Sequence, residues 1–207
     1  MQVVPVELTG AVEGIIDEAV LRRVVTHVGG AVGPVYGREG KASLIERLPA
    51  YNAAAQFAPW LIFIDLNGGA DCAPDFRSRH LDHVSAFMCF RVAVHEIEAW
   101  LMADREELAE YLHVKVDTIP GNPEAIEKPK AQMLQIARRS RSRVVREDML
   151  PRPSGGAKVG PLYSARMIEF ATKRWRPQVA AMASDSLRRS LQRISELIEA
   201  YRAHLSL

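Results

Sequence analysis

The sequence has only two cysteines, Cys72 and Cys89, among its 207 residues. So few thiols cannot form a disulfide framework and are typical of a reducing compartment. No apolar run approaches the roughly 20 residues that a membrane-spanning helix needs. The N-terminal segment lacks the basic start and apolar stretch of a secretory signal, and internal repeats and low-complexity tracts are also missing. We therefore expect a globular protein of the cytoplasm.

The overall composition of the chain is ordinary, but its charged residues are unevenly distributed along the sequence. Apolar residues make up 48% and charged residues 25%, which is typical of a globular domain. Residues 1–129 carry 11 basic and 19 acidic side chains, whereas residues 130–207 carry 16 basic and 6 acidic ones. An acidic half suits a cation site, and a basic half suits a polyanion such as nucleic acid. Mutual attraction of the two halves across an interface explains the same asymmetry, and both readings stay open.

The hydrophobic pattern predicts an α/β fold. Short apolar runs bounded by turn residues indicate strands, and apolar residues at spacings of three and four indicate helices. The predicted strands are 3–8, 32–36, 60–66 and 87–94, and the predicted helices between and after them are 17–28, 41–56 and 96–111. This alternation predicts a domain over residues 1–116 with a mostly parallel central sheet flanked by helices. Residues 117–207 are expected to form a basic, mainly helical extension packed on it, with helices at 131–139, 163–175 and 185–204.

Two acidic residues stand where predicted strands end. Glu13 lies at the junction of the first strand with its helix, and Asp65 ends the buried run 60–66. Ligands of open parallel sheets bind beyond the carboxyl ends of the strands, and converging carboxylates suit Mg²⁺ or Mn²⁺. Glu13 also fits a first helical turn, where the helix dipole favours acids, so capping stays open for it. The sequence context favours a functional role for Asp65, because an acid beside so apolar a run costs desolvation free energy unless it is paired or binds a ligand.

A second acidic pair, Glu96 and Glu98, follows the predicted strand 87–94. If the strand continues to Glu98, both carboxylates point the same way. If a helix has begun, they lie about 200° apart, and only one can face the site. The stretch is not a zinc-protease motif, because the second histidine is missing.

The segment Gly37–Lys41 is not a phosphate-binding P-loop. That motif requires glycine at position 35 and Ser or Thr at position 42, where the chain has Val35 and Ala42. Lys41 at a helix start can still contact a phosphate, although the pattern favours a solvated lysine.

Several stretches resemble one known family. They are VEGIIDEAVL at 12–21, GREGKASLIERLPAYN at 37–52, LIFIDLNGGADCAP at 61–74, FRVAVHEIEAWLMAD at 90–104, EKPK at 127–130, VGPLY at 159–163 and WRPQVAAMASDSL at 175–187. The EGxxD motif followed by a buried strand with an acidic tip resembles the TOPRIM domain of topoisomerases, primases and overcoming-lysogeny-defect nucleases. The full set is similar to the TOPRIM-like domain-of-unknown-function family 4276 and covers most of the chain.

This resemblance implies a divalent-metal site for phosphoryl transfer. Glu13 and Asp65 would hold Mg²⁺ or Mn²⁺, with Asn67 and Asp71 as further ligands and Glu96 or Glu98 completing the acidic shell. The family pattern has a second aspartate where this chain has Asn67, and an amide oxygen brings no negative charge to a hard cation. Asp71 is expected to replace the missing charge if the loop folds back.

The basic residues are expected to contact phosphate groups. The predicted contacts are Lys41, Lys130, Arg138 and Lys158, supported by arginine-rich helices. Solvated helix faces would explain the arginines equally well.

Three functions follow from the sequence. The first is a Mg²⁺-dependent nuclease or related phosphodiester-processing protein. The alternative is a non-catalytic TOPRIM-like partner of an ATPase in a phage-defence system, which Asn67 favours. A hydrolase or binder of small nucleotides would use the same pocket.

Overall fold

The computed structural model describes residues 4–66, 72–152 and 156–206 of the chain. Its centre is a four-stranded sheet in which every pair of neighbours is parallel, in the order β2-β1-β3-β4. The strands are β1 (Glu7–Val12), β2 (Ala31–Gly37), β3 (Trp60–Asp65) and β4 (Met88–Ala93). The predicted α/β class with a parallel sheet flanked by helices is confirmed.

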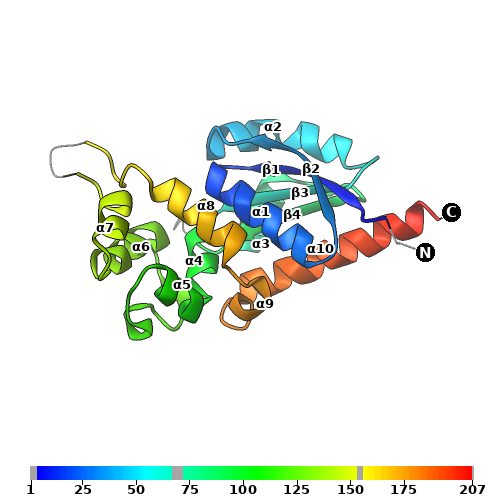
Figure 1. Cartoon of the computed structure of the whole chain (residues 1–207). Coiled ribbons are helices and arrows are strands. Elements are labelled where there is room, and N and C mark those ends of the chain that lie inside the picture. Colours follow the sequence, from blue (N-terminus) through cyan, green and yellow to red (C-terminus); the bar gives the residue numbers. More distant parts are fainter. Residues whose placement is uncertain (1–3, 67–71, 153–155, 207) are drawn as a thin grey trace.

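Helices connect the strands and make up most of the second half of the chain (Figure 1). The helices before residue 116 are α1 (Ile15–His27), α2 (Lys41–Ala54), α3 (Ala73–His80), α4 (Ile97–Met102) and α5 (Arg105–Tyr111). Those after it are the 3-10 turns η1 (Val116–Thr118) and η2 (Pro123–Ala125), then α6 (Pro129–Arg138), α7 (Arg143–Met149), α8 (Tyr163–Lys173), α9 (Pro177–Ala180) and α10 (Asp185–His204).

The first strand begins later than the sequence pattern predicts. Val4 and Pro5 are exposed, and β1 starts at Glu7 and continues to Val12. Proline has no N–H to donate to a sheet ladder, whereas β1 is a central strand that pairs with neighbours on both sides. The predicted strand 3–8 is therefore wrong in its bounds, and the true strand ends directly before Glu13.

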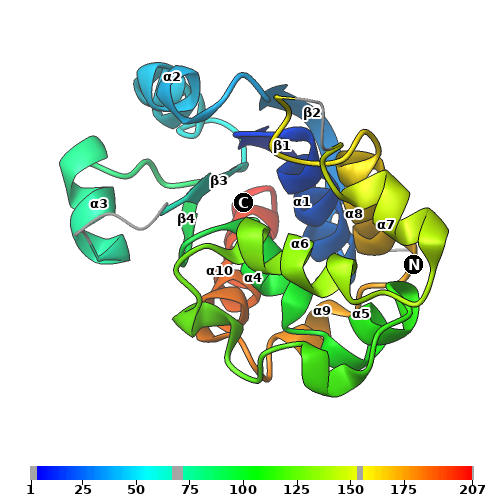
Figure 2. The same ribbon diagram turned by 90° about the vertical axis from the view of Figure 1, so that its left-hand side faces the viewer.

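The sheet separates two hydrophobic cores. On one face, α1 and α10 pack over residues such as Leu61, Phe63 and Cys89. On the other face, α2 and α3 cover Ile62 and Phe90. Successive strand side chains alternate between these faces, which explains why β3 and β4 are apolar almost throughout. Figure 2 shows α2 and α3 on one side of the sheet and α1 and α10 on the other.

The helix predicted over residues 96–111 is two helices. α4 ends at Met102, and α5 begins after Asp104, whose backbone has the non-helical angles φ −88° and ψ 70°. The Asp104 carboxylate is fully buried and accepts hydrogen bonds from the backbone and guanidinium of Arg176. This tertiary ion pair turns the chain at Asp104, so the prediction of one continuous helix is wrong.

The larger core crosses residue 116 without a break. Trp100 donates its indole N–H to Ser186 Oγ at 2.7 Å, and Trp175 donates to the Trp100 carbonyl at 3.1 Å. The division into a domain of residues 1–116 and an extension of residues 117–207 stays a prediction. No helix in the described ranges is long and apolar enough to cross a membrane.

Candidate functional site

The sheet order places the carboxyl ends of β1 and β3 at a topological switch point. The chain leaves β1 toward β2 on one side and leaves β3 toward β4 on the other. In open α/β sheets a ligand crevice forms at such a point, beyond the strand ends. Glu13 follows β1, and Asp65 is the last residue of β3. The structure therefore brings together the two carboxylates that the sequence singled out.

Glu13 is tied directly to the end of β3. Its Oε1 accepts a hydrogen bond from the Asp65 N–H at 2.7 Å, and its own carbonyl accepts one from the Gly40 N–H at 3.0 Å. Lys41 Nζ donates to the Asp65 carbonyl at 2.6 Å and lies 4.6 Å from the centre of the Phe76 ring. Lys41 thus fixes the strand end, and its predicted contact with a phosphate stays a prediction.

A pocket of about 290 Å³ opens beside these residues. Four of its lining side chains are acidic, from β1–α1, β3 and α4. The full lining is Glu13, Gly14, Ile15, Ile16, Asp17, Gly40, Asp65, Glu98, Lys130 and Ser164. We call Glu13, Asp17, Asp65 and Glu98 the acidic cluster.

The position of Asp17 follows from how α1 begins. Gly14 is the N-cap residue, and its N–H donates to Asp17 Oδ2 at 2.7 Å. This reciprocal contact is half of a capping box, and it holds the carboxylate at the start of the helix. Asp17 is only 8% exposed, so its charge is largely removed from water.

The helical alternative holds for Glu96 and Glu98. Glu96 is the extended N-cap residue of α4, and Glu98 lies in the first turn. Glu98 lines the pocket, is 1% exposed and accepts a hydrogen bond from Tyr163 OH at 3.1 Å. Glu96 accepts from the Lys130 N–H at 2.7 Å instead. Of the two, only Glu98 lines the pocket.

Burial raises the pKa of every carboxyl in the acidic cluster, and repulsion by other members of the cluster adds to the shift at Asp17 and Asp65. Desolvation is the largest cause in each case. It raises the pKa of Asp17, with help from Glu98, to about 7. It raises the pKa of Asp65 well above its usual range, and Asp17, Glu13 and Glu98 add to the shift. A positive charge in the pocket would therefore stabilise the ionised cluster.

Lys130 supplies one such charge. Its Nζ lies 3.4 Å from Glu98 Oε1, and its side chain is still 47% exposed. Burial alone would lower the pKa of Lys130, but the attraction of Glu98 and Glu96 outweighs it, and the net shift is upward. The lysine neutralises one of four carboxylates and keeps a face toward solvent.

The donor set of the pocket fits a hard divalent cation, although its ligands are not converged. Carboxylate oxygens are the ligands that Mg²⁺ prefers. Within the described residues, no three His, Cys, Asp or Glu side chains form a group that could hold a metal ion as they stand. The other two predicted metal ligands, Asn67 and Asp71, lie outside the described residues.

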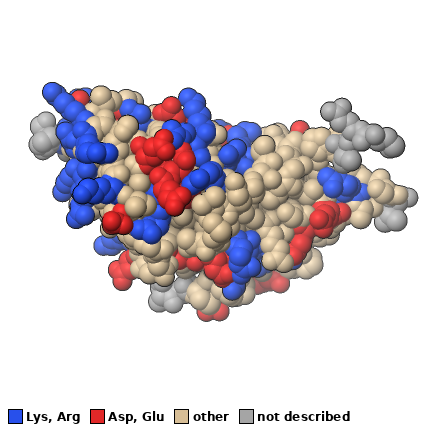
Figure 3. Space-filling model, turned by 60° about the horizontal axis from the view of Figure 1, so that its bottom comes forward, with Lys and Arg blue, Asp and Glu red and all other residues tan. Residues whose placement is uncertain are grey.

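Two of the predicted phosphate contacts lie away from the pocket. Arg138 is the last residue of α6 and Lys158 precedes α8, and both are exposed and absent from the pocket lining. Lys and Arg side chains gather on the end of the molecule that carries α7 (Figure 3). Their predicted role in phosphate binding stays a prediction.

Three residues of this region received no role from the sequence. Asp17 belongs to the EGxxD motif, so its spacing was a usable signal. Tyr163 meets Glu98 across 65 positions of sequence, which no local pattern reveals. His95 has φ +67°, and its buried Nδ1 has no hydrogen-bond partner among the residues that the structure describes. A strained non-glycine residue next to a site is a common feature of functional regions.

No family model, no curated protein and no solved structure matches this chain. Membership of the TOPRIM-like family therefore stays a prediction from the quoted motifs.

Proposed function

We propose that the chain is a Mg²⁺- or Mn²⁺-dependent nuclease, or a related phosphodiester-processing enzyme of the TOPRIM type, acting in the cytoplasm. One observation carries the proposal: four carboxylates with raised pKa values line one pocket at the switch point of the sheet. Such a cluster is costly without a cation. A bound divalent cation would relieve this unfavourable free energy, and the relief would contribute to the affinity for the metal.

Each residue of the pocket has a distinct role in this proposal. Glu13 and Asp65 would hold the metal, which when bound stabilises negative charge on a phosphoryl oxygen. Lys130, half exposed at the rim, would bind a neighbouring phosphate oxygen as a point charge. Asp17, with a pKa of about 7, is suited to hold or release a proton near neutral pH.

The test is cleavage of plasmid DNA and of single-stranded RNA by purified protein with Mg²⁺ or Mn²⁺. Wild-type protein is expected to cleave, and Asp65→Asn is expected to reduce the rate by at least about 100-fold because it removes the negative charge of a metal ligand. The matched control is Asp82→Asn, on an exposed loop residue outside the pocket. Equal cleavage by the Asp65 and Asp82 variants, or none with either metal, would contradict the proposal.

A second candidate is a non-catalytic partner of an ATPase in a defence system. Two observations favour it: Asn67 stands where the resemblance leads us to expect an aspartate, and the Glu13 carboxylate is engaged by the Asp65 N–H. For such a partner we expect co-purification with an ATPase, and we expect calorimetry to detect no Mg²⁺ binding. Mg²⁺ binding that is lost in Asp65→Asn would speak against it.

A further inference from the structure

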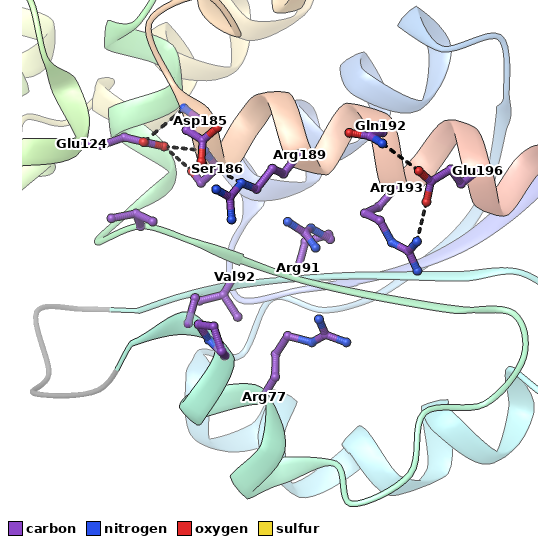
Figure 4. A pocket seen from close by; sticks show the side chains of 13 residues that line it. Arg77, Arg91, Val92, Glu124, Asp185, Ser186, Arg189, Gln192, Arg193 and Glu196 are labelled. Carbon is purple, nitrogen blue, oxygen red and sulfur yellow. Dashed lines mark hydrogen bonds and ion pairs between the residues drawn. The ribbon is translucent and has the colours of Figure 1, made fainter.

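A second and larger pocket lies at the open edge of the sheet. Its volume is about 410 Å³, and it lies between α3 and α10 beside β4 (Figure 4). It shares no lining residue with the pocket of the acidic cluster. Four arginines line it: Arg77 from α3, Arg91 from β4, and Arg189 and Arg193 from α10.

Among the described residues, two of these arginines have carboxylate partners and two have none. Arg189 lies 2.7 Å from Asp185, and Arg193 pairs with Glu196, both on α10. Within the part of the chain that the structure describes, no ion pair is present for Arg77 or Arg91. Two unneutralised cations therefore meet at one pocket.

Arg77 is also short of a hydrogen bond. Its Nε is buried and has no partner within the described residues. A buried donor without a partner is rare in folded proteins and calls for an explanation, such as a water or an ion. Arg91 donates from Nε to Ser190 Oγ at 3.2 Å, which leaves its terminal nitrogens for another acceptor.

The acids at the rim do not provide that acceptor. Glu124 accepts hydrogen bonds from the Ser184 and Ser186 hydroxyls and from the Asp185 N–H. Glu196 is bonded to Arg193 and Gln192. Burial lowers the pKa of Arg91, and the neighbouring Arg77, Arg193 and Arg189 add to that shift. An anion between the arginines would relieve both the desolvation and the repulsion.

The sheet edge adds a backbone donor. β4 is an edge strand, and its Ala93 carbonyl accepts from the Leu66 N–H on the β3 side. Neighbouring residues of a strand direct their backbone groups to opposite sides, so the N–H of Val92 faces the open edge. Val92 lines the pocket.

We propose that this pocket binds a phosphate group, carried by a nucleotide-sized compound or by a nucleic-acid strand. Arg77 and Arg91 approach it from opposite faces of β4, and the Val92 N–H donates from the strand between them. Guanidinium groups bind phosphate through paired N–H donors. The four arginines gather around one stretch of β4 instead of being spaced along it (Figure 4), which fits a compact anion better than an extended acidic peptide.

The binding test is calorimetry with four probes: inorganic phosphate, ADP, a single-stranded deoxythymidine ten-mer, and an acidic peptide of similar charge. We expect saturable binding of one or more phosphate probes, and the ADP and ten-mer arms separate the two sources. Arg77→Met and Arg91→Met are each expected to weaken binding by at least about tenfold. The control is Arg202→Met, an exposed arginine of α10 outside the pocket.

Thermal unfolding without phosphate gives a second, opposite signature. Arg91→Met removes a repelled, partly desolvated charge and is expected to keep or raise the Tm. The Ser190 hydroxyl keeps a hydrogen bond in this variant, because it also donates to the Ser186 carbonyl at 2.7 Å.

Binding of the peptide alone, binding of no probe, or equal phosphate binding by the Arg77, Arg91 and Arg202 variants would overturn the proposal. These assays measure no cleavage and no metal, so their outcome is independent of the nuclease proposal.

Discussion

At the scale of single residues, Asp17 should set how stability depends on pH. Its folded pKa of about 7 lies above the ordinary 3.8, so its protonated form stabilises the fold at low pH. That contribution is complete below about pH 4 and is lost as the pH rises to about 7. Asp17→Asn is expected to raise the free energy of unfolding at pH 8 by roughly 1–3 kcal/mol. The amide oxygen of the asparagine can still accept the hydrogen bond that the Gly14 N–H donates.

The measurement is the Tm of both proteins between pH 4 and pH 8, without divalent metal. The variant should lose part of the decline that the wild type shows over this range, whereas Asp82→Asn should leave the curve unchanged. If Mg²⁺ binds the acidic cluster, it should raise the wild-type Tm at pH 8 more than at pH 5. Parallel curves for the wild type and Asp17→Asn would contradict the shifted pKa.

Gly37 should tolerate no side chain. Its φ is +86°, and an added Cβ would lie 2.3 Å from the Val12 carbonyl oxygen, at the strand end next to Glu13. Gly37→Ala is expected to cost more than about 2 kcal/mol, because a left-handed alanine alone costs about 1–2. Gly29 is the matched control, since its φ is +81° but nothing lies within 4 Å of an added Cβ. Chemical denaturation should therefore separate strain from collision, and equal losses for the two variants would rule out the collision.

At the scale of elements, the break between α4 and α5 depends on one buried ion pair. Asp104 accepts three hydrogen bonds from Arg176 and is fully buried. Asp104→Ala removes the acceptor of the Arg176 backbone N–H and leaves the partly exposed guanidinium without its partner, and it is expected to cost about 1–3 kcal/mol. Glu106→Ala is the control, because that carboxylate is 82% exposed and lies 3.8 Å from the same guanidinium; it should cost less than about 1 kcal/mol. Similar losses in urea unfolding would show that the pair does not hold the turn.

The same scale explains which elements the sequence predicted. The runs that became β3 and β4 are buried on both faces, so continuous apolar residues mark them clearly. α3 and α7 were not predicted. α3 buries only Phe76, and α7 buries only Val145 and Met149, so neither helix has enough buried residues to show a helical period in the sequence. The break at Asp104 depends on Arg176, 72 positions away, and no local pattern contains that partner.

The residues of the candidate site also divide into those that the sequence predicted and those that it did not. Glu13 and Asp65 were predictable because each is an acid at the end of an apolar strand, and the parallel order brings strand ends to one edge. Glu98 was predictable only as one of two alternatives, since the choice depended on where α4 begins. Tyr163 arrives from α8, and the arginine pocket combines α3, β4 and α10. Such contacts follow from tertiary packing, which the sequence pattern does not specify.

At the scale of the whole molecule, the core joins both halves of the chain. The larger core cluster contains residues from α1 and β3 together with residues from α6, α8 and α10. Since the tryptophan contacts also cross residue 116, we expect a single cooperative unfolding transition. In calorimetry the measured enthalpy and the van't Hoff enthalpy should then agree, whereas two transitions would favour separate domains at residue 116.

A substitution in the second half should therefore destabilise the first half as well. Met167 of α8 is fully buried in the shared core, and Met167→Ala is expected to cost about 2–4 kcal/mol. For a chain of this size that lowers the Tm by roughly 5–15 °C. The Tm should fall equally when followed by far-ultraviolet circular dichroism and by the nuclear magnetic resonance signal of the Trp60 indole, which lies next to the smaller core. Met182→Ala is the control, because Met182 is 81% exposed. If Met167→Ala shifted one signal and left the Trp60 signal at its original temperature, the two halves would unfold independently.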